Sequence, residues 1–292
     1  MSERRRDEHL EWVRMAELAV ENKDYERAAH LYKYVTVHFG LLNDTENMRK
    51  FSVKAGECYF NVGKDLQDKD PLKAIQFYIK ASRCFREGGE RGRANKCDDL
   101  IENLYESILR NGKMDSYGDA YSLKDFGDYF VSRSIEKAAE CYRRAAEKAL
   151  KDGKMRLSGS LYGILGECYS KLDRYEAAAE SYAKSASICY ECREFFESAW
   201  RYCLSGFHFI LAGKMDLASA MAARAESICR EDQINVILNS LAAVCRLLSQ
   251  GSLHEAKSLW DRFRWKFKRN YAEMVDLCFQ RLNSKAKEKR SY

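Results

Sequence analysis

The residues best placed for metal chemistry are Cys189 and Cys192, which have the Cys-x-x-Cys spacing found in many zinc sites. Cys203 and His208 follow them and would bring the number of ligands to four. No second Cys-x-x-Cys pair occurs in the chain, and thiols three residues apart on a helix commonly pack against a neighbouring helix as small apolar groups. We therefore predict buried cysteines, no metal and no cofactor.

The candidates for catalysis also favour a structural role. The tetrapeptide Gly-Glu-Cys-Tyr occurs twice, at residues 56–59 and 166–169. A catalytic residue normally occurs once, whereas packing residues recur with a repeated fold. The histidines follow no recognised order with a carboxylate and a nucleophile; they are His9, His30, His38, His208 and His254. We predict no catalytic residues and a protein that is not an enzyme.

A run of alternating cations and aromatic rings near the C-terminus is the sharpest candidate for binding. Residues 262–269 read Arg-Phe-Arg-Trp-Lys-Phe-Lys-Arg. Such a run can bind an acidic protein surface, anionic lipid headgroups or single-stranded nucleic acid. The structural alternative is that Phe263 and Phe267, four apart on a helix, face a bundle and leave the cations in solvent. The candidate partner-binding residues are Arg262, Arg264, Lys266, Lys268 and Arg269.

The positive charge of the chain gathers at the same end. The net charge is +6, and residues 262–292 hold ten Lys or Arg against three acidic residues. Eleven cysteines without an apolar N-terminal stretch are typical of a reducing compartment. No run approaches the roughly 18 to 20 apolar residues that span a bilayer. We expect a cytoplasmic protein with protein partners, with peripheral membrane contact as a second expectation and nucleic acid as the less favoured partner.

The elements that must position these residues are helices. One proline among 292 residues, with 32% charged residues, leaves few interruptions to helices. Five similar segments and a weaker sixth, at 215–218, open amphipathic helices, and their matched alanines are 28, 74, 138, 178, 218 and 256. The differences between successive positions are 46, 64, 40, 40 and 38. The later repeats therefore have a regular period of about 40 residues, and the insertion at 91–133 holds an extra helix over 91–110.

A single helix hairpin cannot bury its apolar face alone, so such repeats must stack. We predict an all-α fold: a right-handed α-solenoid of tetratricopeptide-like hairpins with a small C-terminal helical bundle. Asp70 before Pro71 predicts a helix start, as does Ser252 three residues before Glu255 in a capping box. The expected divisions are 1–230 for the solenoid, 231–284 for the bundle and 285–292 for a basic tail.

The C-terminal third resembles the soluble attachment proteins, or SNAPs. Ordinary tetratricopeptide repeats run about 34 residues, and a longer period is similar to the longer-helix relatives of that class. In the stretch 199–282 the order of features resembles the stacked helix pairs and final bundle of the SNAP family. The matching segments are 200–208, 218–228, 236–243, 251–256, 260–263 and 271–282.

This resemblance implies a scaffold or adaptor for vesicle trafficking. It would grip a helical bundle of membrane-fusion proteins of the SNARE type along a basic face and present it to a hexameric disassembly ATPase. The family's apolar N-terminal loop has no counterpart in residues 1–18, and its leucine-bearing tail is replaced by Lys-Ala-Lys-Glu-Lys-Arg-Ser-Tyr at 285–292. The alternatives are an adaptor for an unrelated protein complex, or a binder of nucleic acid or membrane surfaces through the basic C-terminal helix.

Overall fold

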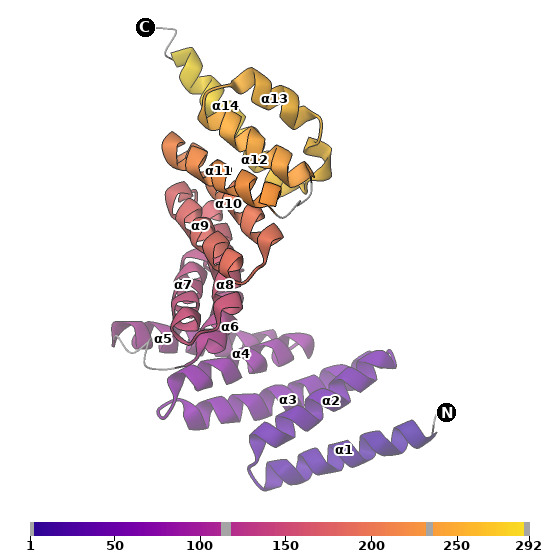
Figure 1. Ribbon diagram of the computed structural model, residues 1–292. Coiled ribbons are helices and arrows are strands. Elements are labelled where there is room, and N and C mark those ends of the chain that lie inside the picture. The colour runs from indigo at the N-terminus through magenta and orange to yellow at the C-terminus, as the bar shows by residue number, and fades with distance from the viewer. Residues whose placement is uncertain (1–2, 112–117, 232–235, 289–292) are drawn as a thin grey trace. The chain divides into compact units, whose positions relative to one another are not determined.

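The computed structural model describes residues 3–111, 118–231 and 236–288, and side chains within 9–284 (Figure 1). Over these ranges the chain forms fourteen α-helices and one 3-10 turn, and it contains no strand. The prediction of an all-α, tetratricopeptide-like α-solenoid is confirmed. The chain divides into two compact units, Met1–Gly118 and Asp119–Tyr292.

The first unit is a row of helices in which each helix packs against the next. Short turns reverse the chain between neighbours, so consecutive helices run antiparallel (Figure 1). The helices are α1 (Glu3–Glu21), α2 (Tyr25–Leu41), α3 (Thr45–Leu66), α4 (Pro71–Glu87) and α5 (Arg91–Arg110). The extra helix predicted over 91–110 is therefore confirmed as α5. Gly112, which follows its end, lies outside the described residues.

The second unit continues the same hairpin pattern and ends in a small bundle. Its helices are α6 (Ala120–Phe130), α7 (Ile135–Lys151), α8 (Met155–Lys171), α9 (Tyr175–Glu191), α10 (Phe195–Ala212), α11 (Met215–Glu231), α12 (Val236–Ser249), α13 (Leu253–Asp261) and α14 (Arg269–Glu288). Helix α14 contacts both α10 and α13, and α12 contacts α10. The predicted divisions at 230 and 284 fall within this unit and stay predictions. The side chains of 285–292 lie outside the described residues.

Glycines on one helix of a hairpin receive tyrosine rings from the next helix. A Cβ added at Gly63 would lie 2.8 Å from the ring of Tyr78, and one at Gly166 would lie 2.8 Å from Tyr182. A Cβ added at Gly127 would likewise meet the ring of Tyr142. Since no other residue leaves room for the ring, the glycine sets how closely the two helices approach.

The two Gly-Glu-Cys-Tyr copies occupy different positions in their hairpins. Gly56 lies under Phe85, two turns along α4 from the ring that Gly63 receives. Gly166 lies under Tyr182 and corresponds to Gly63. Residues seven apart lie two helical turns apart on one face, so both glycine positions meet the same neighbouring helix.

The predicted helix starts are confirmed, but one predicted cap is wrong. Asp70 caps α4 by accepting a hydrogen bond from the backbone N–H of Lys73 at 3.1 Å, with Pro71 in the first turn. Ser252 is the residue before α13, yet its side chain makes no capping hydrogen bond. The start of α13 at Leu253 therefore rests on packing of its apolar residues and not on a capping box.

Candidate functional site

The first unit carries a groove on the face formed by α1, α3 and α5. A cavity of about 430 Å³ lies between α1, α2 and α3, and a cavity of about 350 Å³ lies between α3, α4 and α5. Both cavities are lined by Glu57 and Asn61 of α3, so they adjoin one another. We name this pair of adjoining cavities the α3 groove.

Three cations and three acidic residues line the α3 groove, and ion pairs cross it. Lys54 of α3 contacts Glu17 of α1 at 3.1 Å, and Arg93 of α5 contacts Glu57 at 2.6 Å. The side chains of both pairs are a third to a half exposed. Exposed pairs of this kind contribute no more than about 1 kcal/mol each. A bound segment that carries its own charges can therefore replace them at little cost.

The α3 groove has opposite charges at its two ends. Glu17 and Glu21 line the end formed by α1, and Arg93 and Lys96 line the end formed by α5. Apolar rings lie between these charges, with Phe60 and Phe85 in the smaller cavity and Tyr32 in the larger. A mixture of apolar floor and fixed charges gives orientation as well as contact area to a bound chain.

Sequence reasoning predicted protein partners but named none of the residues in this groove. A signal was present in α3, where Lys54, Glu57 and Asn61 are spaced i, i+3 and i+7. These positions form one polar stripe beside the apolar stripe that faces α2 and α4. Only the neighbouring helices show that the stripe lines a groove.

The second candidate is the basic run near the C-terminus, and it does not form the helix that we predicted. Helix α13 ends at Asp261, Arg264–Lys266 form a 3-10 turn, and Phe267 is extended. Phe263 and Phe267 lie 5.5 Å from the buried ring of Trp260, measured between ring centroids. Both rings therefore pack on Trp260 from a turn and not from a continuation of α13. We name residues 262–268 the basic turn.

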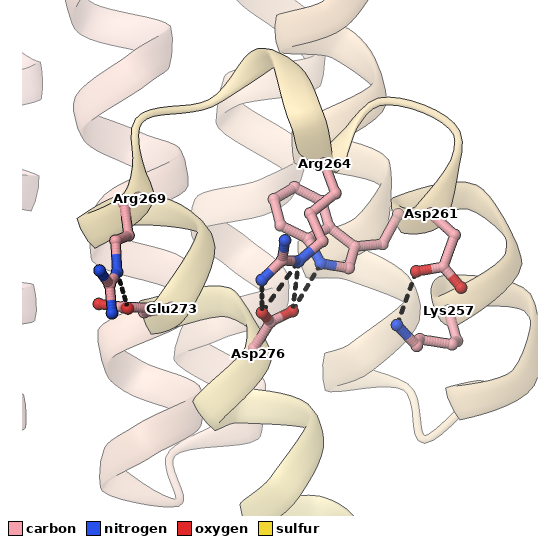
Figure 2. Close-up of polar contacts among 7 residues, drawn as sticks. Lys257, Asp261, Arg264, Arg269, Glu273 and Asp276 are labelled. Atoms are coloured by element: carbon pink, nitrogen blue, oxygen red, sulfur yellow. Dashed lines mark hydrogen bonds and ion pairs between the residues drawn. The ribbon is translucent and has the colours of Figure 1, made fainter.

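An arginine within the basic turn anchors it to α14 (Figure 2). Arg264 Nε donates a hydrogen bond to Asp276 Oδ2 at 3.0 Å, and Trp260 Nε1 donates one to Asp276 Oδ1 at 2.9 Å. Partial burial of Asp276 opposes ionisation, but the hydrogen bonds from Arg264 and Trp260 outweigh it and lower the pKa of this carboxyl. The Asp276 carboxylate of α14 therefore links the basic turn and α13 to α14.

The five predicted partner-binding cations therefore have different environments. Arg264 pairs with Asp276, and Arg269 pairs with Glu273 at 2.6 Å (Figure 2). Arg262, Lys266 and Lys268 are exposed, and none of them has an ion pair within the described residues. The binding role of all five stays a prediction.

The cysteine and histidine candidates lie inside the helical packing. Cys189 and Cys203 are buried, and Cys192 lies at the end of α9 and is partly exposed. His208 is 1% exposed; its Nδ1 lies 2.7 Å from the carbonyl of Leu204 and its Nε2 lies 2.8 Å from Ser170 Oγ. Across the part of the chain that is described, no three His, Cys, Asp or Glu side chains gather as metal ligands. None of the described helices is long and apolar enough to cross a bilayer.

Comparison with known proteins finds weak similarities. No known family profile matches the chain. An alpha-soluble NSF attachment protein from Vitis vinifera is 26% identical over 116 residues, which cover 39% of this chain. The matched part spans 38% of that relative's length.

Solved structures of helical repeat proteins are similar at low sequence identity. BtubC (BKLC) from P. vanneervenii is 17% identical with a TM-score of 0.48, and the alignment covers 80% of this chain and 92% of BtubC. Aspartyl phosphate phosphatase F from Bacillus subtilis is 15% identical with a TM-score of 0.40, covering 95% of this chain and 70% of the phosphatase.

Proposed function

We propose that this protein is a non-enzymatic adaptor that binds another protein in the α3 groove. The observation that carries the proposal is the pair of adjoining cavities, about 430 and 350 Å³, that share Glu57 and Asn61. Stacked helix hairpins form elongated surfaces that suit an extended segment or a helix of a partner. The ion pairs that line the groove are exposed, and a partner's charges would exchange with them.

The charges that line the α3 groove indicate which kind of segment would bind there. Arg93 and Lys96 suit an acidic group on the bound segment, and Glu17 with Glu21 suit a basic group further along it. Phe60 and Phe85 suit an apolar side chain near the acidic group. The partner is therefore a segment in which charges of both signs flank apolar residues, as on the surface of a helical bundle.

The specific form of this proposal is a SNAP-like role. In that role the partner is a helical bundle of SNARE-type membrane-fusion proteins, which the adaptor presents to a hexameric disassembly ATPase. It is supported by the order of helices at 199–282 and by the partial match to an NSF attachment protein. The alternative is an adaptor of the same kind that serves an unrelated protein complex.

The test is the affinity of the full chain for a purified SNARE-type four-helix bundle, measured by interferometry. A variant with Arg93→Glu and Lys96→Glu reverses the charge of one end of the groove, and we expect it to weaken binding at least about tenfold. The control variant carries Lys151→Glu and Lys171→Glu, two exposed lysines of the second unit.

The outcomes of this test distinguish the SNAP-like role from the general adaptor role. Binding that the groove variant weakens and the control does not supports the SNAP-like role. Absence of binding to the bundle rejects that role and leaves the adaptor for another complex. Binding that both variants weaken equally, or neither weakens, shows that the α3 groove is not the site.

A further inference from the structure

Residues 257–276, which include the basic turn, contain more cations than acidic side chains. Three acidic side chains lie within residues 257–276, and each is paired (Figure 2). The pairs are Lys257 with Asp261, Arg264 with Asp276 and Arg269 with Glu273. These pairs use three of the six cations in this range, and the other three are Arg262, Lys266 and Lys268.

The three remaining cations lie within three residues of an exposed tryptophan along the chain. Trp265 exposes 75% of its surface, whereas Trp260, five residues earlier, is fully buried. The Lys266 ammonium lies 5.2 Å from the centre of the Trp265 ring. The exposed ring therefore offers apolar surface whose burial by a partner would favour binding.

The backbone around Trp265 is held by contacts of the neighbouring residues. Phe263 is buried against Trp260, and Phe267 stacks on Trp200 with 6.0 Å between ring centroids. Arg264 is held by Asp276. Phe263 and Phe267, two residues before and after Trp265, thus pack inward, and the Trp265 indole is exposed on a turn that these contacts hold in place.

We propose that the basic turn docks on the surface of an anionic phospholipid bilayer. The Trp265 indole lies at the boundary between headgroups and acyl chains, where tryptophan is enriched in membrane proteins. Arg262, Lys266 and Lys268 contact the anionic headgroups. This binding is separate from the α3 groove and needs no protein partner.

The geometry favours a bilayer over two other anionic partners. Single-stranded nucleic acid is bound in grooves where several aromatic rings stack on successive bases, and the turn presents one ring. A protein partner buries its anchoring tryptophan in a pocket surrounded by further apolar contacts. A single exposed indole, with cations at nearby positions of the same turn, suits a flat, soft and anionic surface.

The test is co-sedimentation of the full chain with vesicles of phosphatidylcholine, alone or with about 30% phosphatidylserine to make the surface anionic. We expect binding to the anionic vesicles and none to pure phosphatidylcholine. Removing each cation should weaken binding about fivefold, so the variant Arg262→Gln, Lys266→Gln, Lys268→Gln should lose roughly 100-fold. Trp265→Ala should lose roughly tenfold.

The second unit, which contains the basic turn, also offers matched control variants. Lys151→Gln, Lys171→Gln, Arg230→Gln removes three exposed cations elsewhere, and Phe196→Ala removes another exposed aromatic ring. Both controls should bind anionic vesicles as the unchanged protein does. Thermal unfolding of every variant checks that folding is unaffected, since none of the substituted side chains is buried.

Fluorescence identifies the inserted residue. The chain has four tryptophans, and only the exposed Trp265 should shift to shorter wavelength on binding anionic vesicles. Trp265→Phe should abolish the shift. The proposal is overturned if anionic vesicles are not bound, if the turn variants bind as well as the controls, or if poly-glutamate or a single-stranded oligonucleotide shifts Trp265 and vesicles do not. A failure to bind the SNARE-type bundle does not affect this result.

Discussion

His208 shows how burial changes the chemistry of a residue that the sequence offers as a metal ligand. Burial lowers the pKa of its imidazole from 6.5 to about 4, against a smaller opposing effect of the hydrogen bond to the Leu204 carbonyl. The ring is therefore neutral at physiological pH and serves as a hydrogen-bonding link between α10 and Ser170 of α8.

This shift predicts a loss of stability in mild acid. Above pH 6.5 the imidazole is neutral in the folded and unfolded chains and contributes no pH dependence. As the pH falls from 6.5 towards 4, the unfolded chain binds a proton that the folded chain excludes, so the free energy of unfolding decreases. At pH 5 the loss from His208 is about 2 kcal/mol.

Urea unfolding at pH 7.5 and pH 5.0 measures this loss. Between the two values His208→Gln should lose about 2 kcal/mol less than the unchanged protein, because glutamine does not titrate. An equal loss in the two proteins would show that His208 is not held neutral by its surroundings.

The cysteines give a second prediction at this scale. Ten of the eleven are buried, and burial raises the pKa of the Cys58 thiol to about 11 and that of Cys97 to about 12. Because the thiolate is the reactive form, a rise from 9 to about 11 lowers the reactive fraction roughly 100-fold. Cys192, which is partly exposed, should be the one thiol that reacts rapidly with Ellman's reagent.

The fast reaction should be absent from Cys192→Ser, and complete reaction should require denaturant. Several rapid thiols in the folded protein would contradict the packing described for these helices.

At the scale of helices, the glycines that receive tyrosine rings predict a clear difference between two substitutions in the first unit. Gly63→Ala places a Cβ 2.8 Å from the ring of Tyr78, which is 1% exposed and has little freedom to move. We expect a loss of about 1 to 3 kcal/mol from overpacking. Gly92→Ala, in α5, meets no atom within 4 Å and should be neutral or stabilise by up to about 1 kcal/mol.

Chemical denaturation of the two variants gives the comparison directly. Equal stabilities would mean that α3 and α4 do not approach as closely as the structure shows.

The helices were largely predictable from the sequence, and the reasons are local. The repeated alanines, the regular spacing of the later repeats and the Asp70–Pro71 start all act within one helix or one hairpin. The basic turn was mispredicted because Phe263 and Phe267 have a spacing that also suits a helix. In the structure α13 ends at Asp261, and the two rings pack on Trp260 and Trp200 from a turn.

The candidate sites were less predictable for the same reason. The cations of the basic turn were found in the sequence, but their ion pairs depend on Asp276 and Glu273 of α14, and these leave three cations without an ion pair in the described residues. The α3 groove depends on residues from five helices, α1 to α5, which extend along the chain from Glu17 to Lys96. A spacing pattern within one helix does not indicate which helix will lie opposite.

At the scale of the whole molecule, the two units offer two separate surfaces. The first unit carries the α3 groove, which suits a protein segment, and the second carries the basic turn, which suits an anionic membrane. An adaptor that carries both can hold a protein partner near a bilayer. Loss of either surface should leave the other working, because the residues that form them belong to different units.

The central claim is that the α3 groove holds a protein partner, and photo-crosslinking from within the groove tests it most directly. Asn61 lines both cavities, so a photoreactive benzoylphenylalanine in its place should form one defined protein adduct in cell extract. The adduct should disappear when Arg93→Glu and Lys96→Glu are added, and it should be absent with the probe at exposed Lys171. The same adducts from both probe positions, or no adduct from Asn61, would contradict the account.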